Sequence, residues 1–355
     1  MSSAQHAFVS RMVPAVAGRM DTGSSPTASF LGEGFPEQFF PPVATDRPAY
    51  EATCRRGYAT MAGKRVVVTG LARNLGSILP TTIRRLERLC RLFADYRVVV
   101  YENDSTDNTK LLLRKWALDD RRVRAVSEDR NDPVNPGTRC LKRVERMALY
   151  RQRCQETILD DHRQFDAVIV VDLDILGGWS EDGIANSFGQ RHWDFIGANG
   201  LIYRRDGHRI NTLRQYDTWA FRVGDDCKPF STAVAGGFLF RCGEPLVPVA
   251  SCFGGLGIYQ MPAYEAGEYS GDDVEHVGFH RSMSRRGFSR IFLNPSQIVM
   301  YGRRHRTGDA LTGSMLAAWS WCTGRPGEPW MFARGERPDG EETGQSPAIA
   351  ASRAA

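Results

Sequence analysis

The chain contains 355 residues, of which 42% are hydrophobic and 25% are charged, and its formal net charge is +5. This length fits one large α/β domain or two modest ones, and the composition is that of a soluble globular protein. The basic balance is carried mainly by arginine, which is compatible with affinity for phosphate-bearing ligands or an anionic membrane face. No basic run is interleaved with aromatic residues, so we expect no nucleic-acid partner.

No apolar run approaches the roughly 18 residues of a transmembrane span, so any membrane contact is expected to be peripheral. The eight cysteines are scattered and form no CxxC pair. This predicts reduced thiols in a cytoplasmic protein, although an even number of cysteines leaves disulfides open.

Composition also divides the chain into segments. Residues 1–60 are rich in Ser, Gly and Pro, which is typical of a flexible N-terminal arm. Residues 323–355 have the composition of a disordered C-terminal tail. Between these segments, residues 61–310 are expected to form a single domain.

Hydrophobic patterning predicts strands that alternate with helices from residue 65 onward. The expected strands are 65–70, 97–104, 121–129 and 166–174, and the expected helices are 77–96, 105–120 and 138–161. This order predicts an α/β, Rossmann-like fold with a mainly parallel sheet and flanking helices. Ligands bind such sheets at the carboxyl ends of the strands, where "TGLARN", "YENDSTDNT", "SEDRND" and "DLD" occur. Shorter strands are expected within 194–200, 236–241 and 254–260.

The segment "VIVVDLD" (168–174) ends a buried strand with two carboxylates. Residues two apart on a strand share a face, so a strand that continues through 174 would point Asp172 and Asp174 the same way and Leu173 into the core. Two carboxylates at a strand end can hold Mg²⁺ or Mn²⁺, with waters and substrate phosphates as the other ligands. The alternative is that both are solvated loop acids.

The segment "VVVYENDSTDNT" (98–109) ends the second strand with polar residues. Glu102 and Asp104 stand two apart, and their carboxylates suit hydrogen bonds to a nucleobase or to ribose hydroxyls. The Ser, Thr and Asp residues that follow are also typical helix N-caps, and both interpretations stay open.

These two segments together resemble the nucleotide-sugar-dependent glycosyltransferases of the GT-A fold, over roughly residues 64–305. Within that fold, the chain is similar to the fungal capsule-associated α-1,3-mannosyltransferases. The motifs that carry this likeness are "VVVYENDSTDNTKLLLR", "RQYDTWAFR", "EPLVPVASCFGGLGIYQMPAY" and "EHVGFH". The GT-A resemblance implies a single catalytic domain with a nucleotide-binding half at 61–178 and an acceptor-facing half at 179–310.

The same resemblance implies roles for residues of the first half. Asp172 and Asp174 would hold Mn²⁺ or Mg²⁺ against the donor diphosphate, so that Asp172 also belongs to the nucleotide-sugar site. The residues that would line the nucleoside pocket are Thr69, Arg73, Glu102 and Asp104. His305 would be a further metal ligand, and the nearby arginines 303, 304 and 306 could neutralise the leaving diphosphate.

In the second half, "GDDVEHVGFH" (271–280) predicts a helix with an acid-rich start. By resemblance, Asp273 or Glu275 would lie beneath the acceptor, where an inverting enzyme uses such an acid as its general base and a retaining enzyme uses it in another role, such as positioning. Spacing does not choose between them, and helix capping is the alternative role. His276 and His280 lie four apart but lack the glutamate of an HExxH motif, so no zinc site is expected.

Other residues of this half are candidates for contacts with the transferred sugar or the acceptor. Gly254 and Gly255 would let the backbone approach a ligand, although a tight turn explains them equally well. Asp217 and Trp219, with Tyr216 and Trp179, could form a sugar-binding platform, although buried aromatic residues are usually part of the core.

The sequence therefore predicts a metal-dependent glycosyltransferase that moves a sugar from a nucleotide donor to a hydroxyl of a glycan or glycolipid. The capsule-family likeness favours GDP-mannose and retention of the anomeric configuration, and a UDP-sugar is the alternative donor. Two further alternatives are a non-catalytic sugar- or nucleotide-binding module and an NAD(P)-dependent oxidoreductase. The oxidoreductase is disfavoured because "TGLARNLGS" after the first strand is not a GxGxxG motif.

Overall fold

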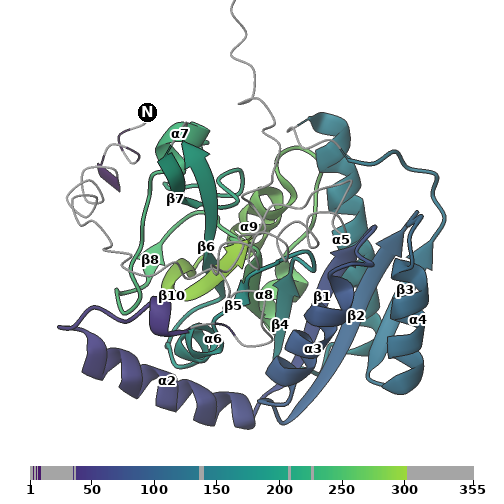
Figure 1. Ribbon diagram of the computed structural model, residues 1–355, viewed down its shortest axis with the longest axis horizontal. Coiled ribbons are helices and arrows are strands. Elements are labelled where there is room, and N and C mark those ends of the chain that lie inside the picture. Colours follow the sequence, from purple (N-terminus) through teal and green to yellow (C-terminus); the bar gives the residue numbers. More distant parts are fainter. Residues whose placement is uncertain are drawn as a thin grey trace, which may run out of the picture.

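A twisted sheet runs through the molecule, and helices pack on both of its faces (Figure 1). The computed structural model describes residues 3, 5, 7, 8, 35, 37–135, 140–206, 209–224 and 228–301. The strand order is β3-β2-β1-β4-β9-β6-β10-β5, with β7 paired to β6 and β8 paired to β10. The strands are β1 (Arg65–Ala72), β2 (Asp95–Asn103), β3 (Val123–Glu128), β4 (Ala167–Val171), β5 (Gly178–Trp179), β6 (Phe195–Asp206), β7 (Arg209–Gln215), β8 (Val247–Pro248), β9 (Leu256–Gln260) and β10 (Ile291–Tyr301).

The direction of the strands confirms the predicted class. The pairs β1–β2, β2–β3, β1–β4 and β6–β10 are parallel. Strand β9 is antiparallel to both of its neighbours, β4 and β6, so β6 and β10 point the same way as β1 to β4. The fold is therefore α/β with a mainly parallel sheet and flanking helices, as the sequence predicted.

Two hydrophobic cores lie on opposite faces of this sheet. The helices are η3 (Glu37–Phe39), α2 (Arg47–Ala62), α3 (Leu79–Cys90), α4 (Thr109–Asp119), α5 (Leu141–Asp161), α6 (Glu181–Phe188), α7 (Thr232–Ala235), α8 (Met261–Ala266) and α9 (Glu275–Arg285). One core joins α2, α3, α4 and α6 to the sheet, and includes Leu79 and Val68. The other joins α5, α8 and α9 to the opposite face, and includes Ile158 and Val67. Val67 and Val68 are adjacent on β1, and their side chains point to opposite faces of the strand.

Parts of the sequence-based assignment differ from the structure. The helix expected at 77–96 ends at Cys90, and β2 already begins at Asp95. Strand β4 ends at Val171 rather than at residue 174, because the chain then turns and the Thr82 hydroxyl binds the Leu173 carbonyl. The strand expected at 236–241 is absent from the described chain, because this apolar segment is a turn and loop whose phenylalanines pack into a core instead of pairing with the sheet.

The predicted flexible arm, residues 1–60, contains a packed helix from Arg47 onward. Helix α2 packs against α6, where the Tyr58 hydroxyl donates a 2.6 Å hydrogen bond to Asp182. The predicted tail at 323–355 lies outside the described residues. The six described cysteines are free thiols: Cys54, Cys90, Cys140, Cys154, Cys242 and Cys252. None of the helices in the described chain is long and apolar enough to cross a membrane.

His280 lies in the core beneath β9 as a buried, uncharged side chain. Its Nδ1 is 2.9 Å from the Ser251 hydroxyl, and its Nε2 is 3.0 Å from the Tyr259 hydroxyl. Burial lowers the pKa of His280 to about 3. The neutral ring therefore satisfies both hydroxyl partners, which a buried imidazolium could not do without the cost of an unpaired charge.

We expect His280 to make the protein sensitive to acid. Between the unfolded-state pKa near 6.5 and the folded value of about 3, the unfolded state binds more protons, so the free energy of unfolding falls as pH falls. The loss from pH 7.5 to pH 5.0 should be on the order of 2 kcal/mol. Urea denaturation at both pH values should show a smaller loss for His280→Gln. The exposed His192→Gln is the control, and an unchanged pH dependence in His280→Gln would contradict the assignment.

Candidate active site

Four carboxylates gather at the carboxyl edge of the sheet. Asp172 and Asp174 follow β4, Asp217 follows β7, and Glu275 begins α9. The four side chains therefore come from segments that are far apart in the sequence and meet at this edge.

A buried arginine connects these carboxylates. Arg151, from the middle of α5, is 4% exposed. Its Nη2 donates a 3.2 Å hydrogen bond to Asp172 Oδ1, and its Nε donates a 3.3 Å hydrogen bond to Glu275 Oε1. The guanidinium also lies 5.1 Å from the centre of the Phe253 ring. Burial lowers the pKa of Arg151, but Glu275 and Asp172 outweigh it and raise that pKa above its ordinary value.

Two stacked tyrosines hold the other side of the Asp-Leu-Asp segment. The Tyr216 hydroxyl lies 3.3 Å from Asp172 Oδ2, and the Tyr301 hydroxyl lies 3.2 Å from Asp174 Oδ2. The two rings are stacked, with centroids 4.0 Å apart and an interplanar angle of 9°. Leu173 between the two acids is 1% exposed, which agrees with its predicted place in the core. The segment is therefore fixed from both sides, although β4 has already ended.

The site carries more negative than positive charge. Burial raises the pKa of Asp172 to about 7. The positive charge of Arg151 lowers this pKa, whereas the negative charges of Asp174 and Glu275 raise it further. Burial, followed by the charges of Asp172 and Glu275, raises the pKa of Asp217 to about 8. One arginine thus faces several carboxylates, and a bound cation would relieve their mutual repulsion.

Asp172 and Asp174 can supply a divalent ion with two oxygen ligands. In the described part of the chain, no three His, Cys, Asp or Glu side chains are grouped so that they could hold a metal by themselves. The other ligands of an ion here would be waters and the oxygens of a substrate, which is the usual arrangement for Mg²⁺ bound by few carboxylates. His305 and the arginines at 303, 304 and 306 lie outside the described residues.

A glycine turn before β9 positions two of the acids. Gly254 and Gly255 have φ angles of 65° and 89°, which side-chain-bearing residues rarely adopt. A Cβ on Gly254 would lie 2.2 Å from the Ala198 carbonyl oxygen. The Gly254 N–H donates to Asp217 Oδ2 at 3.3 Å, and the Gly255 carbonyl accepts from the Asp172 N–H at 2.9 Å. The two glycines therefore act on the carboxylates through the backbone.

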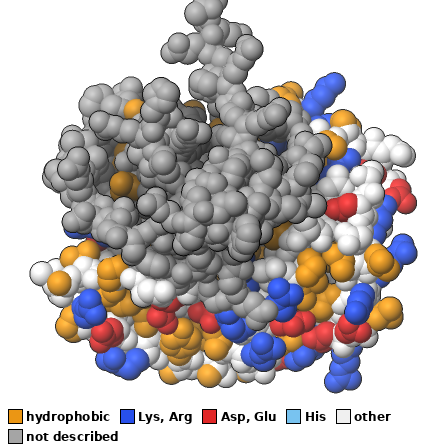
Figure 2. Space-filling view, viewed as in Figure 1, with side chains coloured by type: hydrophobic (Ala, Val, Ile, Leu, Met, Phe, Trp, Pro, Cys, Tyr) orange, Lys and Arg blue, Asp and Glu red, His pale blue; other side chains and the backbone are white. Residues whose placement is uncertain are grey.

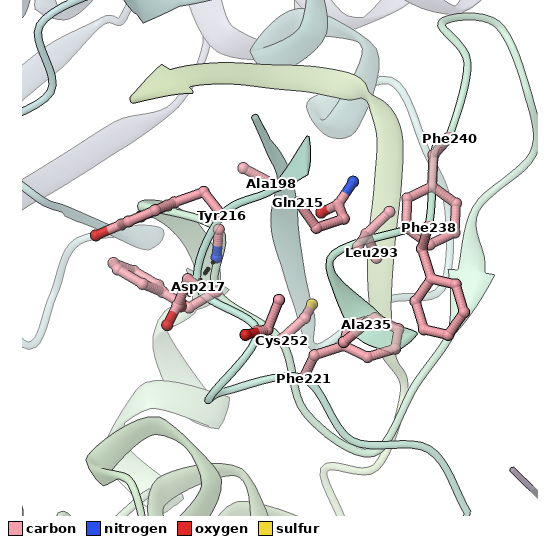
Figure 3. Close-up of a pocket in the computed structure, with 13 residues that line it drawn as sticks. Ala198, Gln215, Tyr216, Asp217, Phe221, Ala235, Phe238, Phe240, Cys252 and Leu293 are labelled. Atoms are coloured by element: carbon pink, nitrogen blue, oxygen red, sulfur yellow. Dashed lines mark hydrogen bonds between the residues drawn. The ribbon is translucent and has the colours of Figure 1, made fainter. Parts of the chain in front are cut away.

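A small cavity lies beside Asp217 (Figure 3). Its volume of about 10 Å³ is enough for about one water molecule. Figure 3 shows Tyr216 and Asp217 on one side, and Phe238 and Phe240 on the other. Trp219 is half-buried with the Arg143 guanidinium 5.3 Å from its ring centre, whereas Trp179 is 2% exposed. Trp179 therefore belongs to the core and offers no ring face for a sugar.

The predicted nucleoside residues form a separate network. Asp104 accepts 2.8 Å hydrogen bonds from the Arg130 and Asn131 N–H groups, and Arg73 donates to the Asp132 carbonyl at 2.6 Å. Desolvation raises the pKa of Asp104, but hydrogen bonds from Asn103 and the loop outweigh it and lower that pKa. Asp104 and Arg73 thus fix the loop that follows β3.

The remaining two nucleoside candidates are buried. Glu102 Oε1 accepts a 2.8 Å hydrogen bond from the Ser105 N–H, and Oε2 accepts from the Ser127 hydroxyl. Thr69 is 2% exposed in the middle of β1. Glu102 therefore fixes the turn after β2, a role that the sequence analysis did not assign to it.

Helix α5 links this loop to the carboxylates. The Tyr150 hydroxyl donates a 2.8 Å hydrogen bond to Asp132 Oδ2, and the Tyr150 ring stacks on Tyr101 with centroids 5.5 Å apart. The next residue, Arg151, binds Asp172 and Glu275. Two consecutive residues of one helix therefore hold both parts of the predicted donor site.

Asp273 and Glu275 have different surroundings, although the sequence could not separate them. Asp273 lies 3.3 Å from Nη2 of Arg222 and 3.3 Å from Nη2 of Arg281. Glu275 pairs with Arg151 through Oε1, whereas its buried Oε2 has no hydrogen-bond partner. An unpartnered buried carboxylate oxygen is costly unless a ligand or water binds it.

No protein-family model and no curated protein matches this sequence. Among solved structures, a mannosyltransferase from Pyrobaculum calidifontis in complex with GDP-Man and Mn²⁺ is 14% identical, with a TM-score of 0.43 over 81% of this chain and 76% of that one. Glucosyl-3-phosphoglycerate synthase from Mycobacterium tuberculosis, in complex with Mn²⁺, UDP and phosphoglyceric acid, is 17% identical, with a TM-score of 0.40 over 78% of this chain and 83% of that one.

A third structure, GalNAc-T7 with UDP, GalNAc and Mn²⁺, is 12% identical, with a TM-score of 0.41 over 75% of this chain and 54% of that one. At these identities and TM-scores, the likeness carries no argument about what this chain binds or transfers. The fungal capsule family stays a resemblance of sequence motifs.

We expect removal of the Arg151 charge to destabilise the fold. Arg151→Met leaves Asp172 and Glu275 buried without their partner, which should lower the free energy of unfolding by about 3–5 kcal/mol. Arg153→Met, on the exposed side of the same helix, should change it by less than about 1 kcal/mol. Urea denaturation measures both changes.

The double variant Arg151→Met/Glu275→Gln tests the cause of that loss. It should recover part of the stability, because one of the two orphaned charges is removed as well. A double variant no more stable than Arg151→Met would show that lost packing, rather than uncompensated charge, explains the effect.

Proposed function

We propose that this protein is a metal-dependent glycosyltransferase of the GT-A fold. It would transfer a sugar from a nucleotide-diphosphate donor to a hydroxyl of a glycan or glycolipid. The observation that carries the proposal is the carboxylate cluster of Asp172, Asp174, Asp217 and Glu275 at the carboxyl edge of a mainly parallel sheet. Edges of this kind are where α/β sheets bind their ligands.

Asp172 and Asp174 would hold Mn²⁺ or Mg²⁺. When bound, the ion would neutralise negative charge on the nucleoside diphosphate as it leaves. Arg151 and Tyr216 would keep the Asp172 carboxylate in one orientation, since each lies against a different oxygen of that group. Tyr301 would do the same for Asp174. His305 remains a proposed additional ligand.

GDP-mannose is the favoured donor and a UDP-sugar the alternative, on the strength of the sequence motifs. Thr69, Arg73, Glu102 and Asp104 would shape the nucleoside pocket, and Arg73 and Asp104 would do so by fixing the loop after β3. Asp217 and Trp219, with the turn at Gly254 and Gly255, would face the transferred sugar or the acceptor. The hydrogen bond between Gly254 and Asp217 supports this grouping.

Glu275 is the better candidate for contact with the acceptor hydroxyl. Its Oε1 is held by Arg151, whereas its Oε2 is buried and has no hydrogen-bond partner among the described residues. In an inverting reaction, this oxygen would accept the proton of the attacking hydroxyl. Asp273 would instead anchor the start of α9 through its two arginines.

The proposal predicts metal-dependent release of nucleotide from a sugar donor. The wild-type protein is incubated with a panel of GDP- and UDP-sugars, with Mn²⁺, Mg²⁺ or EDTA, and free nucleoside diphosphate is measured. At least one donor should be bound or hydrolysed in the presence of metal and not with EDTA. Asp174→Asn should lose this activity while keeping the wild-type melting temperature, and the exposed Asp161→Asn is the matched control.

Other outcomes would select other functions. Binding of a donor without any turnover would favour a non-catalytic binding module, and binding of NAD(P) would favour an oxidoreductase. If no donor is bound or hydrolysed with either metal, or if Asp174→Asn stays fully active, the transferase proposal is wrong.

We expect Glu275→Gln to affect mainly turnover and Asp273→Asn to affect mainly thermal stability. Glu275→Gln should reduce turnover by roughly 10²–10⁴-fold with little change in donor affinity, because it removes one proton acceptor. Asp273→Asn should mainly lower the melting temperature, because it weakens two ion pairs at the start of α9. Steady-state kinetics and thermal unfolding of both variants measure this, and equal kinetic losses would argue against the distinction.

A further inference from the structure

A second pocket lies at the opposite edge of the sheet from the carboxylate cluster. Its volume is about 240 Å³. Lys64 precedes β1, Ala167 begins β4, and Gln260 ends the antiparallel β9, so all three mark the edge where β1 and β4 start. Arg56 from α2 and Arg191 from the segment after α6 complete the cationic part of its lining. In Figure 1, α2 runs along the lower edge of the molecule, with α6 above it.

The lining of this pocket is basic and contains neither aspartate nor glutamate. Figure 2 shows a different pattern on the described surface of the viewed face, where acidic side chains are interspersed with the basic ones. Lys64 Nζ is 3.5 Å from Asp166, just outside the lining, and its side chain stays 40% exposed. Arg191 is exposed and has no ion pair within the described chain.

The basic side chains come from segments that are held together. Arg56 Nε donates a 2.8 Å hydrogen bond to the Gly189 carbonyl, which fixes α2 against the end of α6. A Cβ on Gly189 would lie 2.1 Å from the Thr53 carbonyl oxygen, so this contact between the two helices is close. The pocket is therefore built by packed elements, and its cations are brought together by the fold.

We propose that this pocket binds a phosphate-bearing ligand. Two guanidinium groups and one ammonium group around a volume of this size match a multiply charged phosphate. Arg191 can offer paired N–H donors to phosphate oxygens, whereas Arg56, whose Nε and Nη2 donate to Gly189 and Thr53, adds its remaining N–H groups. The Gln260 side-chain amide, which has no hydrogen-bond partner among the described residues, adds a neutral donor. The phosphate is either that of a small soluble molecule or that of a lipid headgroup.

The site is independent of the proposed transferase reaction. It lies across the sheet from Asp172 and Asp174, and none of its lining residues belongs to the candidate active site. The proposal can therefore fail without affecting the proposed function, and the reverse also holds.

The test uses the full chain in EDTA, so that no divalent ion contributes. Binding of inorganic pyrophosphate is measured by isothermal titration calorimetry at low ionic strength. The double variant Arg56→Gln/Arg191→Gln should bind at least roughly tenfold more weakly than wild type, because two charge-assisted contacts are lost. Arg55→Gln, an exposed neighbour on α2 outside the pocket, is the matched control and should stay within about twofold.

A second arm distinguishes the two sources of phosphate. Phosphatidylcholine vesicles with and without phosphatidic acid are sedimented with each protein. Binding to the acidic vesicles that the double variant loses and Arg55→Gln keeps would identify a lipid headgroup. Pyrophosphate binding that depends on Arg56 and Arg191, without vesicle binding, would identify a soluble phosphate.

The remaining outcomes overturn the proposal. The proposal is wrong if the wild-type protein binds neither pyrophosphate nor acidic vesicles, or if the double variant binds them as well as wild type does. It is also wrong if the double variant and Arg55→Gln lose equal amounts of binding affinity. The last result would mean that the basic surface attracts anions without a defined site. The double variant and Arg55→Gln should both retain the wild-type rate of nucleotide release, because neither alters the candidate active site.

Discussion

The pairing of one buried guanidinium with two carboxylates is the constraint on which this structure depends. Arg151 is almost fully buried, so it must have anionic partners, and Asp172 and Glu275 need its charge for the same reason. Asp172 follows a strand of the first half of the domain, whereas Glu275 starts a helix of the second. The pairing therefore fixes the relative position of the two halves at the edge where the candidate site lies.

The surroundings of this pairing explain why the site carries an excess of negative charge. A buried ion pair often contributes little net stability, because desolvation offsets the attraction between its members. Here several acids face a single arginine, and the raised pKa values of Asp172 and Asp217 follow from that excess. Such an excess of carboxylates, with pKa values shifted by burial and by one another, is more typical of a functional site than of a structural core.

The sequence predicted the α/β class and the approximate place of the first strands and helices, because hydrophobic periodicity is a local signal. It also predicted that Asp172 and Asp174 stand at a strand end. It did not identify Arg151 or Tyr301, since Arg151 meets Glu275 across 124 residues and Tyr301 meets Asp174 across 127 residues. One signal for Arg151 was present: it shares a helix face with Val144, Ala148 and Ile158, where an arginine is out of place without a buried partner.

The chain leaves the site at Asp217 and returns to it at Gly254, and one hydrogen bond joins these two ends, 37 residues apart. This excursion is closed at its base, and in its described part Phe221, Phe230, Phe238 and Phe240 pack into the core shared with α5, α8 and α9. A related chain that kept these anchors and varied the residues between them would change the surface beside the carboxylates without moving the strands that carry them.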